Sequence, residues 1–318
     1  METLANNRYL IHRIKFFVVL FLEISAIILF LLIFLFFITN RRYLKKLQNQ
    51  ALLILFIVNF IQLSLGIPIL MNFLRFSRVT PETSIYCKTW MYIESTLDAA
   101  NEFLVAVISI QRHILIFRPN LLNIRFKLYL LYYLPLLFCI IYPIIFYMSA
   151  IILYSCDDAQ WNFTLNMCGD TICYFSNNAI LAGYDWIVNT GLPIMAIILG
   201  NIILVIRVIK QKHRRQRTVS WSKQRHMTLQ LISISSLYLV TWLPSIIIGL
   251  SQQINPSDYL YGIGEYILSD LTYLVCLLLP WMSLGLLPDF KKWLLKLLRH
   301  VKKPTNIVGT TTLKTRHN

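Results

Sequence analysis

Seven apolar runs, each near the length that a helix needs to cross a bilayer, constrain this chain more than any other feature. A spanning helix takes about 20 mostly apolar residues. The runs occupy approximately residues 16–39, 50–73, 87–117, 127–153, 183–208, 226–251 and 261–286. The third run is the least apolar because it carries three acidic residues. Together the runs predict an all-α membrane protein, a seven-transmembrane helix bundle.

The chain divides around this bundle into four predicted segments. Residues 1–15 form a short N-terminus, residues 16–286 the bundle, residues 287–300 a short amphipathic eighth helix, and residues 301–318 a disordered tail. The full-length first run indicates a spanning helix rather than a cleavable signal. In the eighth helix apolar residues recur at helical spacing: Phe290, Trp293, Leu294, Leu297 and Leu298. Basic residues fill its other face, which is typical of an interfacial helix.

Composition and charge exclude two other classes of protein. The chain is 57% hydrophobic and 14% charged, whereas soluble domains carry about 25% charged residues. A net charge of +16 is also found in nucleic-acid-binding proteins. Here, however, the basic residues cluster between the apolar runs, as in the cytoplasmic loops of membrane proteins. We therefore expect membrane lipids and no nucleic acid among the partners.

The distribution of basic residues predicts the orientation. With the N-terminus outside, 24 of the 30 Lys and Arg residues lie on the cytoplasmic side, as the positive-inside rule requires. We expect a multi-pass protein of the plasma membrane with an extracellular N-terminus. The sequon Asn162-Phe163-Thr164 then lies in an outer loop, so Asn162 is a predicted glycosylation site.

Several motifs recur at fixed positions in the runs. Cys87 opens the third run, and Arg112 follows 25 residues later within Gln111-Arg112-His113. The other motifs are Pro193 in the fifth run, Thr241-Trp242-Leu243-Pro244 in the sixth, and Leu279-Pro280-Trp281-Met282-Ser283 in the seventh. Phe290 follows Pro280 by ten residues. In this spacing the chain resembles the rhodopsin-like G-protein-coupled receptors, as a divergent member.

This resemblance implies a receptor rather than an enzyme, with no cofactor. It binds an extracellular ligand and activates a heterotrimeric G protein at its cytoplasmic face. The resemblance assigns G-protein contact to Arg112 and His113. It assigns the activation switch to four residues: Asn59, Trp242, Pro244 and Pro280.

The resemblance also pairs Cys87 with an outer-loop cysteine. We favour Cys173, which leaves Cys156 to pair with Cys168, and Cys168 is the alternative partner of Cys87. No His accompanies these cysteines, so no metal site is expected. Cys139 and Cys276 lie within apolar runs and are predicted to be unpaired.

Some positions depart from the family pattern. Gln111 replaces the acid that precedes Arg112 in the family, and Gln224 stands where the sixth helix often offers another. An amide lacks the charge that would hold Arg112 in the resting state. We therefore expect Arg112 to be held less tightly in the resting state, and measurable signalling without ligand. We call the contact that holds Arg112 the latch.

An acidic stripe marks the predicted ligand site. Glu94, Asp98 and Glu102 recur every fourth residue and so share one helix face, and Asp185 and Glu265 add acids in the outer half. Charges in a span usually face a cavity or a partner. The functional interpretation is a pocket for a small ligand, a cationic amine or a short peptide, lined also by Trp242 and Tyr273.

Two alternatives stay open for the acidic stripe. The carboxyl groups are either neutral members of a polar network or the proton sites of a proton-coupled transporter. Tyr273 stands where opsins carry the lysine that binds retinal, so a light sensor is not expected.

Overall fold

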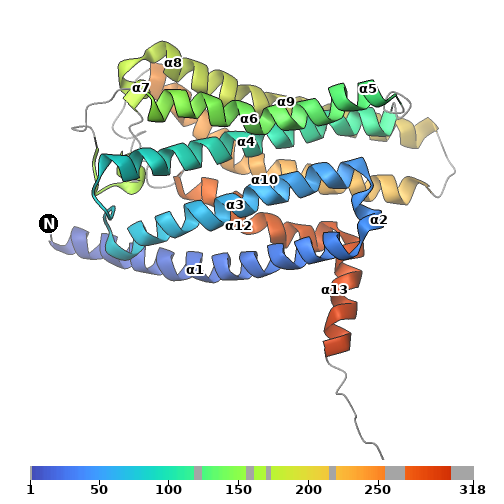
Figure 1. The fold of residues 1–318 in the computed structure, drawn as a ribbon, viewed down its shortest axis with the longest axis horizontal. Coiled ribbons are helices and arrows are strands. Elements are labelled where there is room, and N and C mark those ends of the chain that lie inside the picture. The colour runs from blue at the N-terminus through green and yellow to red at the C-terminus, as the bar shows by residue number, and fades with distance from the viewer. Residues whose placement is uncertain are drawn as a thin grey trace, which may run out of the picture.

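The computed structural model describes residues 2–117, 124–154, 161–169, 173–214, 220–254 and 269–301, which contain helices and turns but no strand. Long helices run side by side, and α13 leaves the bundle at one end (Figure 1). The helices are α1 (Glu2–Thr39), α2 (Arg41–Leu44), α3 (Leu47–Phe76), α4 (Ser84–Phe117), α5 (Arg125–Leu128), α6 (Leu134–Tyr147), α7 (Cys173–Asn177), α8 (Ala179–Tyr184), α9 (Leu192–Arg214), α10 (Ser220–Ile254), α12 (Ser269–Leu286) and α13 (Pro288–Val301).

Wider or tighter turns complete two of the spans and one outer loop. Three are π-helical, namely η2 (Tyr129–Tyr133), η3 (Met148–Ile152) and η6 (Asp185–Gly191), and η5 (Asn166–Gly169) is a 3₁₀ turn. The fourth predicted run is thus α5–η2–α6–η3, and the fifth is α8–η6–α9. Helix α1 begins at Glu2, so helical structure extends back through the segment predicted to precede the bundle. Residues 261–268 of the seventh run lie outside the described residues.

Five of the described helical segments are long and apolar enough to cross a membrane, and α12 with α13 makes a sixth candidate, bent by 82°. Helix α4 is not among them. It is long enough, at 34 residues, but Glu94, Asp98 and Glu102 interrupt its apolar sequence. The third run was predicted to be the least apolar of the seven, and it forms α4, which packs at the centre of the bundle.

The distribution of side chains is reversed relative to a soluble protein. Large apolar side chains cover the outside, such as Phe21 at 71% exposed and Ile145 at 63%. Polar side chains are buried inside, among them Asn59, Glu102 and Arg112. Such a surface is stable in lipid, where buried polar groups bond to one another. The predicted all-α membrane fold is confirmed.

Helix α4 is the centre of the packing. It lies against α3 on one side and against α6 and α9 on the other. Helix α12 packs against α10, α1 and α3, and so closes the bundle. The central position of α4 explains why its polar residues meet side chains from so many helices.

Two of the π-helical turns lie just before prolines. Turn η2 ends two residues before Pro135, and η6 ends two residues before Pro193. Proline has no N–H to donate to the preceding turn, and a widened turn is a common local solution. Both turns carry residues that contact α4 or the outer loop, so the prolines help to position the candidate site.

The disulfide joins Cys87, near the N-terminal end of α4, to Cys168. The favoured pairing of Cys87 with Cys173, and of Cys156 with Cys168, is therefore wrong, and the alternative partner is correct. The reason is local backbone geometry: Met167, Cys168 and Gly169 have φ values of 48°, 58° and 93°. This left-handed stretch turns Cys168 inward, where it is fully buried. Cys156 and the side chain of Cys173 lie outside the described residues.

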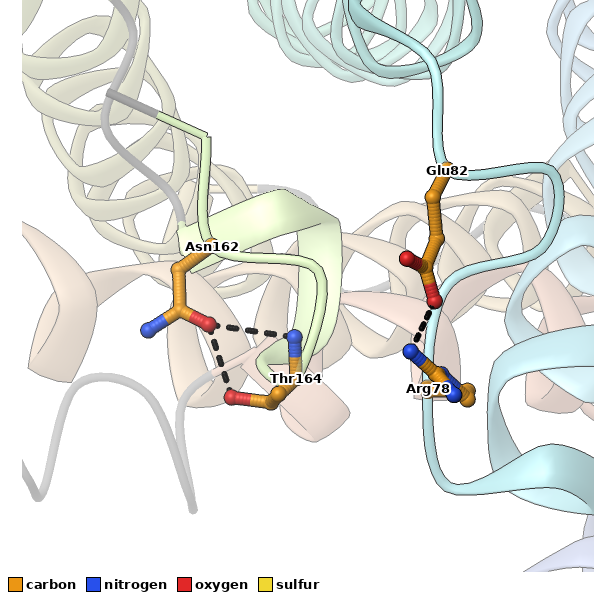
Figure 2. A network of polar contacts seen from close by, with 4 residues as sticks. All are labelled: Arg78, Glu82, Asn162 and Thr164. Carbon is orange, nitrogen blue, oxygen red and sulfur yellow. Dashed lines mark hydrogen bonds and ion pairs between the residues drawn. The ribbon is translucent and has the colours of Figure 1, made fainter. Parts of the chain in front are cut away.

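The same outer loop packs against the loop between α3 and α4. Val79 N donates to Phe163 O at 2.8 Å, and Arg78 forms an ion pair with Glu82 nearby (Figure 2). Asn162 Oδ1 accepts hydrogen bonds from Thr164 N and Thr164 Oγ1 at 3.1 and 2.7 Å. Its Nδ2, the atom that a glycan would join, points away from Thr164 (Figure 2).

A double-mutant cycle tests the disulfide. Cys87→Ser and Cys168→Ser should each lower the free energy of unfolding by about 2–4 kcal/mol, and the double variant should lose no more than either single variant. The measurement is thermal unfolding of the purified protein, with Cys139→Ser as the control for a buried, unpaired cysteine. Additive losses would show that the two cysteines are not bonded to each other.

Candidate functional site

The candidate ligand site is built around the three acids of α4. Glu94 and Glu102 are 2% and 1% exposed, and Asp98 lies one turn from each on the same face. Within the described part of the chain the ion pairs are Lys15–Asp270 and Arg78–Glu82. No described cation therefore forms an ion pair with the three carboxyl groups, of which Glu94 and Glu102 are buried and Asp98 is half-buried.

Glu94 is held in a niche formed by a glycine of α3. A Cβ added to Gly66 would lie 2.2 Å from Glu94 Oε1, so only glycine leaves room for the carboxyl group. Trp90 and Tyr273 lie beside Glu94. Glu94 Oε1, Trp90 Nε1 and Tyr273 Oη are buried close to one another, but none of them makes a hydrogen bond of ordinary geometry. Gln62 Nε2 lies 3.5 Å from the other carboxyl oxygen, Glu94 Oε2, and Glu102 Oε2 is buried without a hydrogen bond.

Asp98 begins a chain of hydrogen bonds that crosses the bundle. Gln62 Nε2 donates to Asp98 Oδ1 at 2.6 Å, and Asn101 Nδ2 donates to Gln62 Oε1 at 2.8 Å. Asn59 Nδ2 in turn donates to Asn101 Oδ1 at 2.8 Å and lies 3.2 Å from Tyr238 Oη. This amide relay connects an acid of α4 to a tyrosine of α10 through α3.

Asp185 belongs to a different cluster. Its Oδ1 accepts hydrogen bonds from Tyr147 Oη at 2.7 Å and Asn189 Nδ2 at 2.5 Å, and its Oδ2 accepts one from Tyr174 Oη at 2.8 Å. Tyr142 Oη donates to Asn189 Oδ1 at 2.8 Å. These contacts tie η6 to α6 and to the outer-loop helix α7. Both oxygens of Asp185 are thus bonded, whereas Glu94 Oε1 is not.

The remaining predicted pocket residues are placed as follows. Trp242 of α10 is half-buried and packs against the apolar core, and Tyr273 of α12 is 3% exposed. Glu265 lies outside the described residues. A Cβ added to Gly249 of α10 would lie 2.4 Å from the indole ring of Trp186, so this glycine admits the ring where α10 meets η6.

At the inner end of α4, Gln111 does not face the neighbouring arginine. Its Nε2 donates to the main-chain oxygens of Leu131 at 3.4 Å and Tyr132 at 2.8 Å. Both oxygens belong to the π-helical turn η2, which ends two residues before Pro135. Gln111 thus supplies a side-chain donor to the widened turn that precedes the proline.

The latch hypothesis stays a prediction. In this structure Gln111 faces two carbonyl oxygens of η2 rather than Arg112, and a carboxylate in that orientation would meet those oxygens. The side chain of Gln224 lies outside the described residues.

The two residues predicted to contact a G protein differ in exposure. Arg112 is 2% exposed and lies within electrostatic reach of Tyr43. His113 is half-buried, and its Nε2 lies 2.8 Å from Gly200 O of α9. Helix α9 also approaches α4 closely here, because a Cβ added to Gly200 would lie 3.3 Å from Ser109 Cβ. Both residues therefore lie between helices in this structure.

The predicted switch residues lie where α10 and α12 are weakened by proline. Pro244 interrupts α10 and Pro280 interrupts α12. Next to Pro244, Thr241 Oγ1 donates back to Leu237 O and Tyr238 O at 3.1 and 3.0 Å, a contact that favours helix bending. Asn59, fully buried in α3, bonds to Tyr238, which lies one turn before Thr241 in α10. The relay thus ends beside the weakened part of α10.

The comparisons agree with this architecture. Residues 16–282 match the family model described as 7 transmembrane receptor (rhodopsin family). The chain belongs to this family of seven-helix membrane receptors. No curated protein matches the sequence.

Sequence reasoning missed four residues of the site: Gln62, Gly66, Asn101 and Tyr238. A signal for the amides was present, since Asn59 with Gln62 and Asp98 with Asn101 are each spaced by three residues and share a helix face. Gly66 carried no such signal, because its role depends on a side chain from another helix.

The fit of Glu94 into its niche leads to a prediction. Gly66→Ala should lower the free energy of unfolding by about 1–3 kcal/mol, as overpacking does. In a Glu94→Ala background the same change should cost little, because the clashing carboxyl group is absent. Thermal unfolding of the four proteins measures the coupling. Gly285→Ala is the matched control, since nothing lies within 4 Å of a Cβ added there. Equal losses in both backgrounds would contradict the contact.

A second prediction concerns Gln111. Gln111→Glu keeps the length of the side chain but removes the donor, so unfolding should become easier by about 1–3 kcal/mol. With Pro135→Ala, which restores a main-chain N–H, the cost should shrink. Thermal unfolding of the cycle measures both effects. If Gln111→Glu instead stabilised the protein and lowered its ligand-free signalling, the latch hypothesis would be supported.

Proposed function

We propose that this receptor binds a small cationic ligand, an amine or a short basic peptide, beside Glu94 and Asp98. It then activates a heterotrimeric G protein at the opposite end of the bundle. The observation that carries the proposal is that Glu94 and Asp98 lie near each other and form no ion pair with a described cation, while Glu94 Oε1 makes no hydrogen bond. Carboxyl groups that no cation neutralises, in an apolar interior, favour an incoming positive charge.

The amide relay supplies a route from ligand to helix movement. A cation at Asp98 would compete with Gln62 for the carboxylate, and Gln62 is also bonded to Asn101. Rearranging one amide changes the donors and acceptors of the next, as far as Tyr238. Releasing Tyr238 from Asn59 frees α10 next to Pro244, where the helix bends most easily.

An opening of α10 would expose the inner end of α4, where Arg112 and His113 now lie between helices. In this proposal the G protein contacts these two residues in the open state. The ligand provides the free energy by binding the open state more tightly than the closed one.

The proposed orientation has the N-terminus outside, in the plasma membrane. The excess of Lys and Arg on the other side of the bundle supports it. So does the exposed Asn162, whose Nδ2 is directed away from the loop (Figure 2). We propose that Asn162 carries a glycan.

Transport of protons or of a proton-coupled solute is the second candidate function, and the buried carboxyl groups of α4 favour it. It predicts net movement of charge across the membrane. The receptor proposal predicts none.

The test is a screen of amines and basic peptides in cells, with G-protein dissociation as the readout. For an active compound, Asp98→Asn should raise the half-maximal concentration about 30-fold or more, the equivalent of ~2 kcal/mol for a desolvated charge pair. Arg112→Gln should abolish activation but keep ligand binding. Glu82→Gln, which removes an exposed acid, is the control.

An N-terminal tag stained on intact cells matches surface expression between variants and also reports the orientation. A normal response from Asp98→Asn would overturn the proposed ligand site. A proton flux without G-protein dissociation would favour the transporter.

A further inference from the structure

Residues of α1, α2 and α13 line a groove. Helix α2 and the start of α13 lie at the same end of the bundle, beside the end of α1 (Figure 1). The volume of the groove is about 840 Å³, within the ~300–1,000 Å³ range of small-molecule sites. It is far from the acids of α4 and has no part in the function proposed above.

The rim of the groove is strongly basic. Five cationic residues line it, with Asp289 as the one acid among the lining residues: Arg41, Arg42, Lys46, Lys292 and Lys296. All five are exposed. The ion pairs within the described ranges lie elsewhere, at Lys15–Asp270 and Arg78–Glu82, so these five charges are not neutralised by a described acid.

The floor of the groove is aromatic and held in place. The ring of Phe36 contacts Tyr43, Phe290 and Trp293, at centroid distances of 5.2, 5.5 and 5.7 Å. Asn49 Nδ2 donates to Tyr43 O at 2.7 Å and fixes the short α2. The groove is therefore preformed by contacts among three elements.

Tyr43 is also among the residues that line the groove. Burial, followed by the nearby Asp289, raises the pKa of Tyr43 to about 12. The hydroxyl group is therefore neutral at physiological pH and repels no anion.

We propose that this groove binds the headgroup of a membrane lipid that carries several phosphates. Five cations around one cavity match a ligand with three or more negative charges. The planar guanidinium group of arginine also binds phosphate oxygens through two parallel hydrogen bonds. The proposal rests on the orientation proposed above, in which this end faces the cytoplasm, where anionic lipids concentrate.

A lipid is favoured over a soluble phosphate because the groove lies beside the lipid-facing surface. Ile38, 68% exposed, lines it together with Trp293. Helix α13 has apolar residues on one face and basic residues on the other, as expected for a helix at the membrane interface. An acyl chain would lie against α1 while its headgroup occupies the basic rim.

The experiment measures binding of a fluorescent phosphatidylinositol bisphosphate to the purified full chain in phosphatidylcholine nanodiscs. The test variant is Arg42→Gln/Lys292→Gln/Lys296→Gln, within the groove. The matched control is Lys45→Gln/Lys291→Gln/Arg299→Gln, which removes three charges from the same elements outside the groove. Each basic residue near an anionic surface contributes about fivefold in affinity, so the test variant should bind tenfold or more weakly. The control should stay within about twofold of wild type.

Equal weakening in both variants would overturn the proposal, because it would reflect general surface charge rather than a site. Unchanged binding in both would overturn it as well. Soluble inositol trisphosphate is the second arm, and competition as strong as that of the lipid would assign the groove to a free phosphate instead. Binding is measured without ligand or G protein, so failure here is distinct from failure of the proposed receptor function.

Discussion

The arrangement depends on one constraint, the burial of polar side chains on the central helix α4. In lipid there is little hydrophobic force between helices, so packing and polar contacts determine which faces meet. Asp98 and Asn101 bond to α3, Gln111 bonds to η2, and His113 contacts α9. Each contact fixes one neighbour of α4, and the disulfide at Cys87 fixes its outer end.

The two ends of the bundle differ in charge, and the relay between them is neutral. The acids of α4 and Asp185 lie toward the half that holds the disulfide, whereas Arg112 and the basic residues of α2 and α13 occupy the other end. Amides link Asp98 to Tyr238, so in the proposed mechanism a change at the acids reaches α10 through neutral groups and no charge has to cross the apolar interior. Such networks strengthen one another when fully bonded, which suits a link that either holds or breaks as a unit.

Much of the fold was predictable from the sequence, because spanning length and charge distribution are properties of the chain alone. Motif spacing also predicted the family. The disulfide partner was not predictable, since it depends on the left-handed turn at Met167 and Cys168. The niche at Gly66 and the orientation of Gln111 likewise depend on atoms supplied by other helices. Sequence patterns identified which residues are unusual, and the fold determined what each of them contacts.

The bond from Gln111 to the fourth span has a consequence for protein engineering. The donor on α4 bonds to the widened turn that precedes Pro135, although 24 positions separate Gln111 from Pro135 in the chain. A chimera that takes one of these two spans from a relative with an acid before the arginine would place a carboxylate near carbonyl oxygens. The third and fourth spans should therefore be exchanged together in a chimera, with the junctions placed outside both.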